Sequence, residues 1–363
     1  MRLLWKIAKY ASIVGVSVIA LAIVALFSLR AYNQRTNAPR FAIQSPNGIE
    51  ESGYIKIGGI EQWLQIRGQD RDNPVLLCVH GGPGATWIPL TENFIPWEKQ
   101  FTVVLWDQRG AGRTLGATGA SIAETMSVDR MTKDGIEVAE YLRTHLRKDK
   151  LVLLGHSWGS ILGINMAKRR PDLFSAYVGT GQASDMPKSI ATAYAHLQEQ
   201  ARAANDQRTL KVLTRIGQPP FDSREKIEVF FSSMGKYPSA SDRAAMQTIG
   251  AKLLAPKPDY SLHDEVDRVR GFMAVPPLRV YIELLNTRLG SLGPHFDVPV
   301  FFIQGAEDNL TQPSLAEDYL KTIEAPHKEM VLLKGGGHFA FLSMADKFLE
   351  DLVSRVRPMV TKQ

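Results

Sequence analysis

Short apolar runs and amphipathic segments alternate along residues 54–181. A helical pattern precedes the fifth run, where Met131, Ile136 and Leu142 share one face and Ser127 occupies an N-cap position. Runs that are apolar throughout and separated by helices predict a mostly parallel sheet with helices on both faces. The runs are YIKIGG (54–59), EQWLQIRG (61–68), PVLLCVHGG (74–82), FTVVLWDQ (101–108), KLVLLGHS (150–157) and FSAYVGTG (174–181).

The pattern changes in the second half of the chain. Residues 186–295 are rich in helix formers and polar residues, and strand signals return only with VPVFFIQG (298–305) and EMVLLKGGG (329–337). We therefore predict an α/β core over residues 51–185 and 296–363, interrupted by a helical cap at 186–295.

The N-terminal segment resembles neither the α/β core pattern nor the helical cap pattern. Residues 11–29 (ASIVGVSVIALAIVALFSL) carry no charge, and as a helix they would span about 28 Å, close to the thickness of a hydrocarbon core. We predict a transmembrane signal anchor at residues 1–30, followed by a polar, turn-rich linker at 31–50.

The flanks of this segment bear on its orientation. Three basic residues precede the apolar run and three follow it closely, so the positive charges nearly balance. The short, basic N-terminal flank favours an N-terminus on the cytoplasmic side, with the large domain exported to the periplasm or the cell exterior. The alternative is a protein secreted after signal cleavage, although the run is longer than a usual signal h-region and lacks an A-x-A site.

Composition narrows the function classes. The net charge is +6, but no block of like charges occurs, so we expect no nucleic-acid partner. The one cysteine, Cys78, excludes an internal disulfide. The chain has no G-x-G-x-x-G, P-loop or H-E-x-x-H motif, and we expect no cofactor and no metal. Nothing in the sequence indicates an oligomeric state.

Candidate chemistry begins at Gly155, Ser157 and Gly159, which form a G-x-S-x-G pattern between a buried strand and an amphipathic helix. Glycines at these positions allow the sharp turn that exposes a nucleophilic serine at the edge of a sheet. Ser157 is therefore the predicted nucleophile, and the backbone N–H of Trp158 is a predicted donor to the oxyanion.

A serine nucleophile needs a base and an orienting acid. His338 in KGGGHFAF follows the last predicted strand, which gives it the chain order and the sheet end that the base requires. Asp308 in QGAEDN follows the preceding strand and is the predicted acid. Glu307 is the reserve candidate, and Asp185 is a weaker one.

The second oxyanion donor is expected from the loop after the third core strand. That loop is HGGPG at 80–84, where glycines allow the backbone to approach a substrate closely. We predict Gly82 as the donor and Gly81 as a substrate contact.

HGGPG at 80–84, DQRGAGRT at 107–114 and GHSWGS at 155–160, with a late aspartate and histidine, resemble the proline iminopeptidase-like branch of the α/β-hydrolase superfamily. The resemblance extends from about residue 50 to the end, more loosely in the cap. It implies an α/β-hydrolase fold with a triad of Ser157, Asp308 and His338 and an oxyanion hole of Gly82 and Trp158. Thr114 stands where the family's DQRGxGxS motif ends in serine.

The same resemblance implies that cap glutamates hold the substrate's free α-amine. We predict Glu199 for this role, with Glu225, Glu228, Glu265 and Glu283 as further candidates, although no tryptophan lies in the cap.

The implied activity is an aminopeptidase that releases an N-terminal residue, such as proline, from small peptides. A carboxylesterase or lactonase would use the same triad, because the cap selects the substrate. An epoxide hydrolase would carry aspartate in place of Ser157, and a non-enzymatic binding protein is the remaining class.

Overall fold

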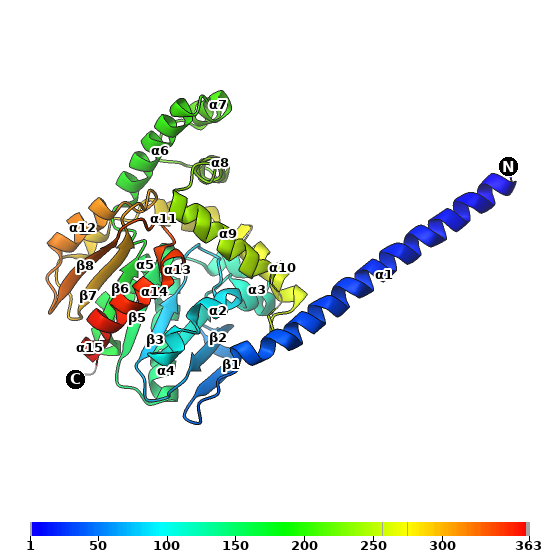
Figure 1. Cartoon of the computed structure of the whole chain (residues 1–363). Helices are drawn as coiled ribbons and strands as arrows, with labels where there is room; N and C mark the ends of the chain where they lie inside the picture. Colours follow the sequence, from blue (N-terminus) through cyan, green and yellow to red (C-terminus); the bar gives the residue numbers. More distant parts are fainter. Residues whose placement is uncertain (1, 256, 274, 361–363) are drawn as a thin grey trace.

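The structure is a computed structural model that describes residues 2–255, 257–273 and 275–360 (Figure 1). Within this part, eight strands form one sheet in the order β1-β2-β4-β3-β5-β6-β7-β8. The strands are β1 (Ile49–Ile57), β2 (Ile60–Gly68), β3 (Val75–Val79), β4 (Thr102–Asp107), β5 (Leu151–His156), β6 (Phe174–Thr180), β7 (Val300–Gly305) and β8 (Lys328–Leu333).

The sheet is parallel from β4 through β8, whereas β1 and β2 form an antiparallel hairpin that also pairs antiparallel with β4. The central register pairs Leu76 of β3 with Val152 of β5. This arrangement confirms the predicted α/β-hydrolase fold with a mostly parallel sheet. It brings the carboxyl ends of β3, β5, β7 and β8 to the same edge, where ligand sites form in such sheets.

Helices cover the sheet on both faces. The helices of the described chain, of which α1 and α6–α8 extend away from the sheet (Figure 1), are α1 (Arg2–Phe41), α2 (Thr91–Phe94), α3 (Gly112–Thr118), α4 (Val128–Leu146), α5 (Trp158–Arg169), α6 (Met186–Ala203), α7 (Gln207–Ile216), α8 (Arg224–Met234), α9 (Ala240–Leu254), α10 (Leu262–Met273), α11 (Leu278–Leu285), α12 (Pro313–Thr322), α13 (Ala340–Ser343), α14 (Ala345–Asp351) and α15 (Arg357–Val360). The predicted cap of α4 is confirmed, because the Ser127 side chain accepts a hydrogen bond from the N–H of Arg130 at 3.0 Å.

Two apolar layers form the core, one on each face of the sheet. Successive strand residues point to opposite faces, so Leu77 of β3 packs with α4 and α5, whereas Leu76 packs with α14 and the chain around Trp97. Both side chains are fully buried. The uninterrupted apolar strands of the sequence pattern thus reflect burial on both sides.

Helices α6 to α11 stand between β6 and β7 in the chain, and α6, α7 and α8 project from the sheet domain (Figure 1). Helices α6, α7 and α8 each place apolar side chains in the core, such as Ile190, Leu213 and Phe230. The helical composition of residues 186–295 therefore corresponds to helices in the structure, and the cap boundaries remain a prediction.

The predicted linker over residues 31–50 is helical in its first part and irregular only over residues 42–48. Helix α1 continues without a break through Phe41, and β1 begins at Ile49. The C-terminal part of α1 is held by polar contacts: Arg30 and Gln34 donate to backbone carbonyls of residues 257–260, and Arg40 pairs with Glu92 at 2.7 Å. A helix held by polar contacts shows no regular spacing of apolar residues in its sequence. For this reason the sequence pattern predicted an irregular segment here.

Candidate active site

Ser157 lies in the sharp turn between β5 and α5, with φ 53° and ψ −120°. Its backbone N–H donates to the carbonyl of Thr180 at 3.1 Å. The flanking glycines allow close approach, since a Cβ at Gly159 would lie 2.0 Å from the carbonyl oxygen of Val79 and one at Gly155 would lie 2.5 Å from that of Gly159. The strained φ of a non-glycine residue is typical of a functional position.

His338 connects Ser157 with Asp308. Its Nε2 lies 3.1 Å from Ser157 Oγ, and its Nδ1 lies 2.9 Å from Asp308 Oδ2. The three residues come from the ends of β5, β7 and β8, so the parallel sheet brings them together from positions 181 residues apart. This is the arrangement that a nucleophile, its base and an orienting acid require.

Backbone and hydroxyl donors fix the Asp308 carboxylate. Oδ1 accepts from the N–H groups of Leu310 and Thr311 at 2.9 Å each, and Oδ2 accepts from Thr311 Oγ1 at 2.7 Å. The carboxylate therefore turns back into its own loop, and α12 begins only at Pro313. One side chain thus satisfies the loop donors and orients the histidine.

At Asp308 and His338, charges and hydrogen bonds shift each pKa in the direction opposite to the effect of burial. Burial alone would raise the pKa of the Asp308 carboxyl, but His338 and the hydrogen bonds from Thr311 outweigh it and lower that pKa. Burial alone would lower the pKa of His338, but the charge and hydrogen bond of Asp308, together with the charge of Asp242, raise it. The pair therefore stabilises an imidazolium beside Ser157.

The HGGPG loop contacts the serine turn. A Cβ at Gly81 would lie 3.2 Å from Ser157 Cβ, and Gly82 has φ +126°, a conformation that favours glycine. Trp158 begins α5, so its N–H is one of the free donors at a helix N-terminus. The two predicted oxyanion donors thus come from segments on either side of Ser157.

Gln108 ties these two segments together, a role that the sequence did not suggest. Its Nε2 donates to the carbonyl of His80 at 2.8 Å, and its Oε1 accepts from Trp158 Nε1 at 3.1 Å. The side chain is fully buried. The DQRG motif therefore supports the loop through an amide that bridges it to α5.

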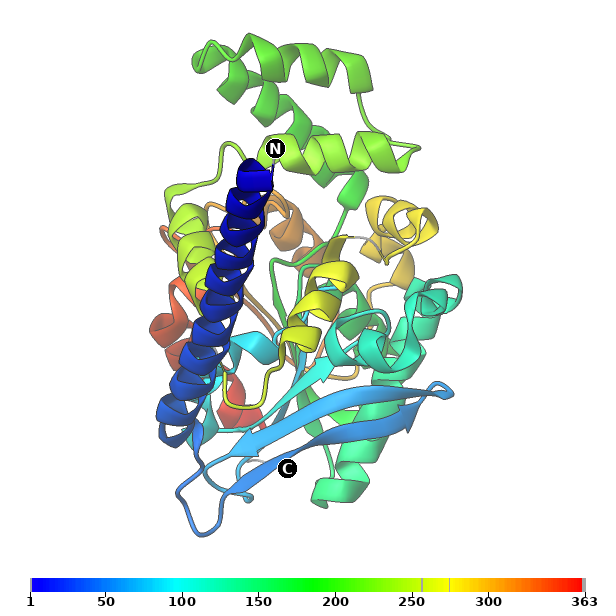
Figure 2. The same ribbon diagram turned by 90° about the vertical axis from the view of Figure 1, so that its right-hand side faces the viewer.

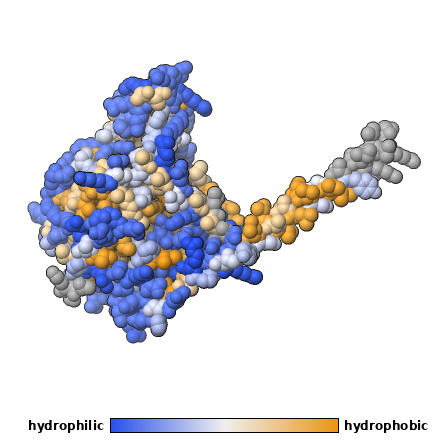
Figure 3. Space-filling view, in the orientation of Figure 1, coloured by the Kyte–Doolittle hydropathy of each residue, from blue (hydrophilic) through white to orange (hydrophobic). Residues whose placement is uncertain are grey.

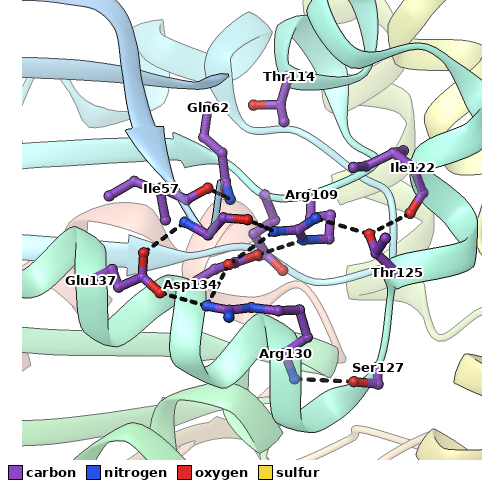
Figure 4. A network of polar contacts seen from close by, with 12 residues as sticks. Ile57, Gln62, Arg109, Thr114, Ile122, Thr125, Ser127, Arg130, Asp134 and Glu137 are labelled. Atoms are coloured by element: carbon purple, nitrogen blue, oxygen red, sulfur yellow. Dashed lines mark hydrogen bonds and ion pairs between the residues drawn. The ribbon is translucent and has the colours of Figure 1, made fainter. Parts of the chain in front are cut away.

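Arg109 of the same motif forms a buried ion pair with Asp134 of α4 (Figure 4). Its Nε lies 2.7 Å from Asp134 Oδ2, and it also donates to Thr125 and to the carbonyl of Gly58. Arg130 contacts the same carboxylate at 2.9 Å. The network joins the β1–β2 hairpin to the core behind the site.

The predicted amine-binding glutamates make none of the contacts described for Ser157, His338 and Asp308. Glu199 is exposed on α6, and none of the contacts described for the triad residues involves it. The other candidates are engaged elsewhere: Glu225 with Arg215, Glu228 with Arg224, Glu265 with Arg268, and Glu283 with the N–H of Val128. Glu199 as a substrate contact remains a prediction.

Asp242 of α9 is an acidic residue near the site that the sequence did not single out. Its Oδ1 accepts a hydrogen bond from the N–H of Phe339 at 3.1 Å, directly after His338. Its only sequence signal is its place in the first turn of a helix, after Ser239 at the N-cap.

The alternative acids have other environments. Glu307 is exposed next to Asp308, and the Asp185 side chain caps α6 by accepting from the N–H of Lys188.

Two further histidines lie near the site. His80 bonds to Gly81 and Gln108 through its ring, and His156 contacts the carbonyl of His338. Burial lowers the pKa of His80 to about 4 and that of His156 to about 3. Among the described residues, no group of histidine, cysteine and acidic side chains is arranged to hold a metal ion.

The parallel sheet and the sharp turn at Ser157 are features of the α/β hydrolase fold. The sequence model of the α/β hydrolase fold matches residues 74–344, and the chain belongs to this family. A probable aminopeptidase of Bacillus subtilis is 30% identical over 307 residues, covering 84% of this chain and 95% of that protein. These findings confirm the resemblance to the proline iminopeptidase-like branch and the prediction of a hydrolase.

Solved structures agree on the fold. A proline iminopeptidase-related protein from Thermus thermophilus has a TM-score of 0.60 at 20% identity, covering 87% of this chain and 100% of its own. Proline iminopeptidase from Mycobacterium smegmatis has a TM-score of 0.56 at 18% identity, covering 86% of this chain and 99% of its own. At these identities the likeness concerns the fold alone.

Proposed function

We propose that Ser157, His338 and Asp308 form the catalytic triad of a serine hydrolase that works through an acyl-enzyme. The observation that carries this proposal is the chain of contacts from Asp308 Oδ2 to His338 Nδ1 at 2.9 Å and from His338 Nε2 to Ser157 Oγ at 3.1 Å. Both distances are within hydrogen-bond range, as transfer of the serine proton to the imidazole requires.

In the first half of the reaction, His338 takes the proton of Ser157 while Oγ attacks the substrate carbonyl carbon. Asp308 stabilises the imidazolium that forms, consistent with the raised pKa of His338. The N–H groups of Gly82 and Trp158 hold the negative oxygen of the tetrahedral intermediate, and Gly81 lies against the substrate.

The tetrahedral intermediate then collapses. His338 protonates the leaving amine or alkoxide, the C=O double bond forms again, and the acyl group remains on Ser157 as the acyl-enzyme. Water then enters, gives a proton to His338 and attacks the acyl carbon. Collapse of the second tetrahedral intermediate releases the acid and returns the proton to Ser157.

Our first candidate substrate is a small peptide from which the N-terminal residue is removed, with Glu199 as the predicted amine contact. The similarity to a probable aminopeptidase over nearly the whole of both chains supports this choice. The second candidate is an ester or lactone. The engagement of four cap glutamates with other groups favours it, because an ester substrate needs no carboxylate to hold an amine.

A substrate panel separates the two candidates. The full-length protein in detergent is assayed with proline 2-naphthylamide and with p-nitrophenyl butyrate. Turnover of the amide supports the aminopeptidase, whereas ester turnover alone supports the second candidate. We expect Ser157→Ala to lower either activity about 10⁴-fold or more, and Ser354→Ala, an exposed serine on the C-terminal helical segment, to leave it unchanged. Retention of activity in Ser157→Ala would contradict the mechanism.

Labelling provides an independent check of the nucleophile. A fluorophosphonate should form one adduct at Ser157, located by peptide mass spectrometry, and the adduct should be absent from Ser157→Ala. No adduct on the active wild type would argue against a nucleophilic serine.

For location, we propose that α1 anchors the protein in a membrane with the sheet domain outside the cytoplasm. Residues Ser12–Phe41 are long and apolar enough to cross a membrane, and their apolar side chains are exposed. A signal sequence would meet the same description. N-terminal sequencing of the mature protein distinguishes an intact anchor from a cleaved signal.

A further inference from the structure

Helix α10 has an unusual concentration of exposed apolar side chains. Outside α1, nine large apolar residues of the described chain are more than a third exposed, and five of them lie on this one helix. They are Leu262 (45% exposed), Val266 (53%), Val269 (47%), Phe272 (54%) and Met273 (65%).

Most of this surface forms a stripe along one side of the helix. Leu262, Val266, Val269 and Met273 follow the i, i+4, i+7, i+11 spacing that places side chains on one helix face. Gly271 lies on the opposite side, where a Cβ would lie 2.9 Å from the carbonyl oxygens of Gly84 in the HGGPG loop and of Gly110. Helix α10 therefore has one face on the catalytic domain and an apolar face on the outside.

Arg30 and Gln34 of α1 contact the loop that leads into α10. Arg30 donates to the carbonyl of Tyr260 at 2.7 Å, and Gln34 donates to the carbonyls of Lys257 and Tyr260 at 2.8 and 3.1 Å. Helix α10 begins two residues later, at Leu262. Figure 2 shows α1 leaving the body between α9 and α10, and Figure 3 shows its apolar surface projecting from a mostly hydrophilic body.

The residues on α1 indicate where a bilayer would end. Arg30 is the first charge after the uncharged run, and Tyr10 and Tyr32, both about two-thirds exposed, flank that run. Their separation of 22 helical residues is about 33 Å, close to the thickness of a hydrocarbon core, and tyrosine is enriched at both membrane interfaces. Because Arg30 bonds to Tyr260, the loop that leads into α10 lies at this boundary.

We propose that the apolar stripe of α10 docks on the lipid surface into which α1 inserts, as a second membrane contact. A helix with this pattern lies in the interface plane with its apolar face among the headgroups and upper acyl chains. The other face of α10 remains on the HGGPG loop through Gly271, so the catalytic domain is held against the membrane by an element that contacts its own active-site loop. The inference rests on α1 as an anchor and is independent of the substrate.

Site-specific fluorescence tests the docking. The only cysteine, Cys78, is buried at 1% exposure, so an introduced exposed cysteine takes the label. The full chain with Val266→Cys carries an environment-sensitive dye and is reconstituted into phosphatidylcholine–phosphatidylglycerol vesicles containing doxyl-labelled lipid. Matched variants are Leu332→Cys on β8, an apolar residue of similar exposure (46%), and Val18→Cys within α1.

We expect the dye at residue 266 to shift to shorter wavelength and to be quenched severalfold more by doxyl lipid than the dye at 332. The dye at 18 should be quenched strongly as well. Quenching at 18 with solvent-like emission at 266 would overturn the docking, and no quenching at 18 would overturn the anchor and the docking with it. The dye at 266 could instead become shielded in detergent as the protein concentration rises, with no quenching in vesicles. That result would assign the stripe to contact with a second copy of the chain and overturn the proposal.

Discussion

Asp242 of α9 accepts a hydrogen bond from the backbone N–H of Phe339, the residue that follows His338. The carboxylate lies so close to this loop that a Cβ at Gly337 would meet its Oδ2 at 2.3 Å. Through this contact a helix between β6 and β7 both holds the loop that carries His338 and places a negative charge near it. Burial alone would lower the pKa of His338, but the Asp308 carboxylate and, to a smaller extent, the charge of Asp242 raise it.

The first prediction concerns the pH dependence of the activity if His338 is the base that we propose. The pKa of His338 lies above its ordinary value of 6.5, and only neutral His338 accepts the proton of Ser157. The value of kcat/KM should therefore fall as the pH decreases through a pKa above 6.5. Asp242→Asn keeps the oxygen that accepts from Phe339 but removes the charge, so the pKa falls and the acid limb moves to lower pH. The pH profile of kcat/KM measures the shift.

Asp346→Asn is the matched control, because Asp346 is exposed on α14 and has no contact with His338 among those described. Its profile should coincide with that of the wild type. An unchanged profile in Asp242→Asn would show that this charge does not act on the base.

The second prediction separates two adjacent acids. Asp308→Asn puts an amide where His338 Nδ1 needs an acceptor, which favours the wrong tautomer, and kcat should fall about 10⁴-fold. Glu307→Gln changes the exposed neighbour and should leave kcat within about twofold. Steady-state kinetics on whichever substrate the panel identifies measures both. Loss of activity in the Glu307 variant alone would assign the acid to Glu307.

The third prediction concerns the buried pair behind the site. Asp134→Ala leaves the guanidinium of Arg109, which is 2% exposed, without its carboxylate, and should lower the free energy of unfolding by about 3–5 kcal/mol. Asp129→Ala, on the same helix, breaks exposed pairs with Lys133 and Arg169 and should cost at most about 1 kcal/mol. Urea unfolding followed by circular dichroism compares them. Equal losses would mean that burial does not distinguish the two sites.

Much of this architecture was accessible from the sequence because its signals are local. A strand buried on both faces reads as an unbroken apolar run, and the carboxyl ends of such strands share one edge of a parallel sheet. Chain order then identified Ser157, Asp308 and His338 as candidates, and the structure places their side chains within hydrogen-bond distance of one another.

The features that the sequence did not predict depend on contacts between segments that are distant along the chain. Nothing near Gln108 in the sequence indicates that its amide joins the carbonyl of His80 to the indole of Trp158. Asp242 lies 97 residues from Phe339 along the chain. The continuation of α1 was missed for the same reason, because Arg30 and Gln34 are held by carbonyls of a loop more than 200 residues away.

The last prediction concerns the serine turn. In Gly159→Ala the new methyl group would lie 2.0 Å from the carbonyl oxygen of Val79, and neither backbone can move without separating α5 from β3. The start of α5 carries Trp158 and follows Ser157, so we expect a clear fall in Tm and loss of most activity.

Gly250→Ala is the matched control for Gly159→Ala, since Gly250 also lies in a helix but a Cβ there meets nothing within 4 Å. It should be neutral or stabilise the protein by up to about 1 kcal/mol. Thermal melts and activity assays on both variants decide the matter: a Gly159→Ala protein that melts and turns over like the wild type would rule out close backbone approach as the reason for glycine at this position.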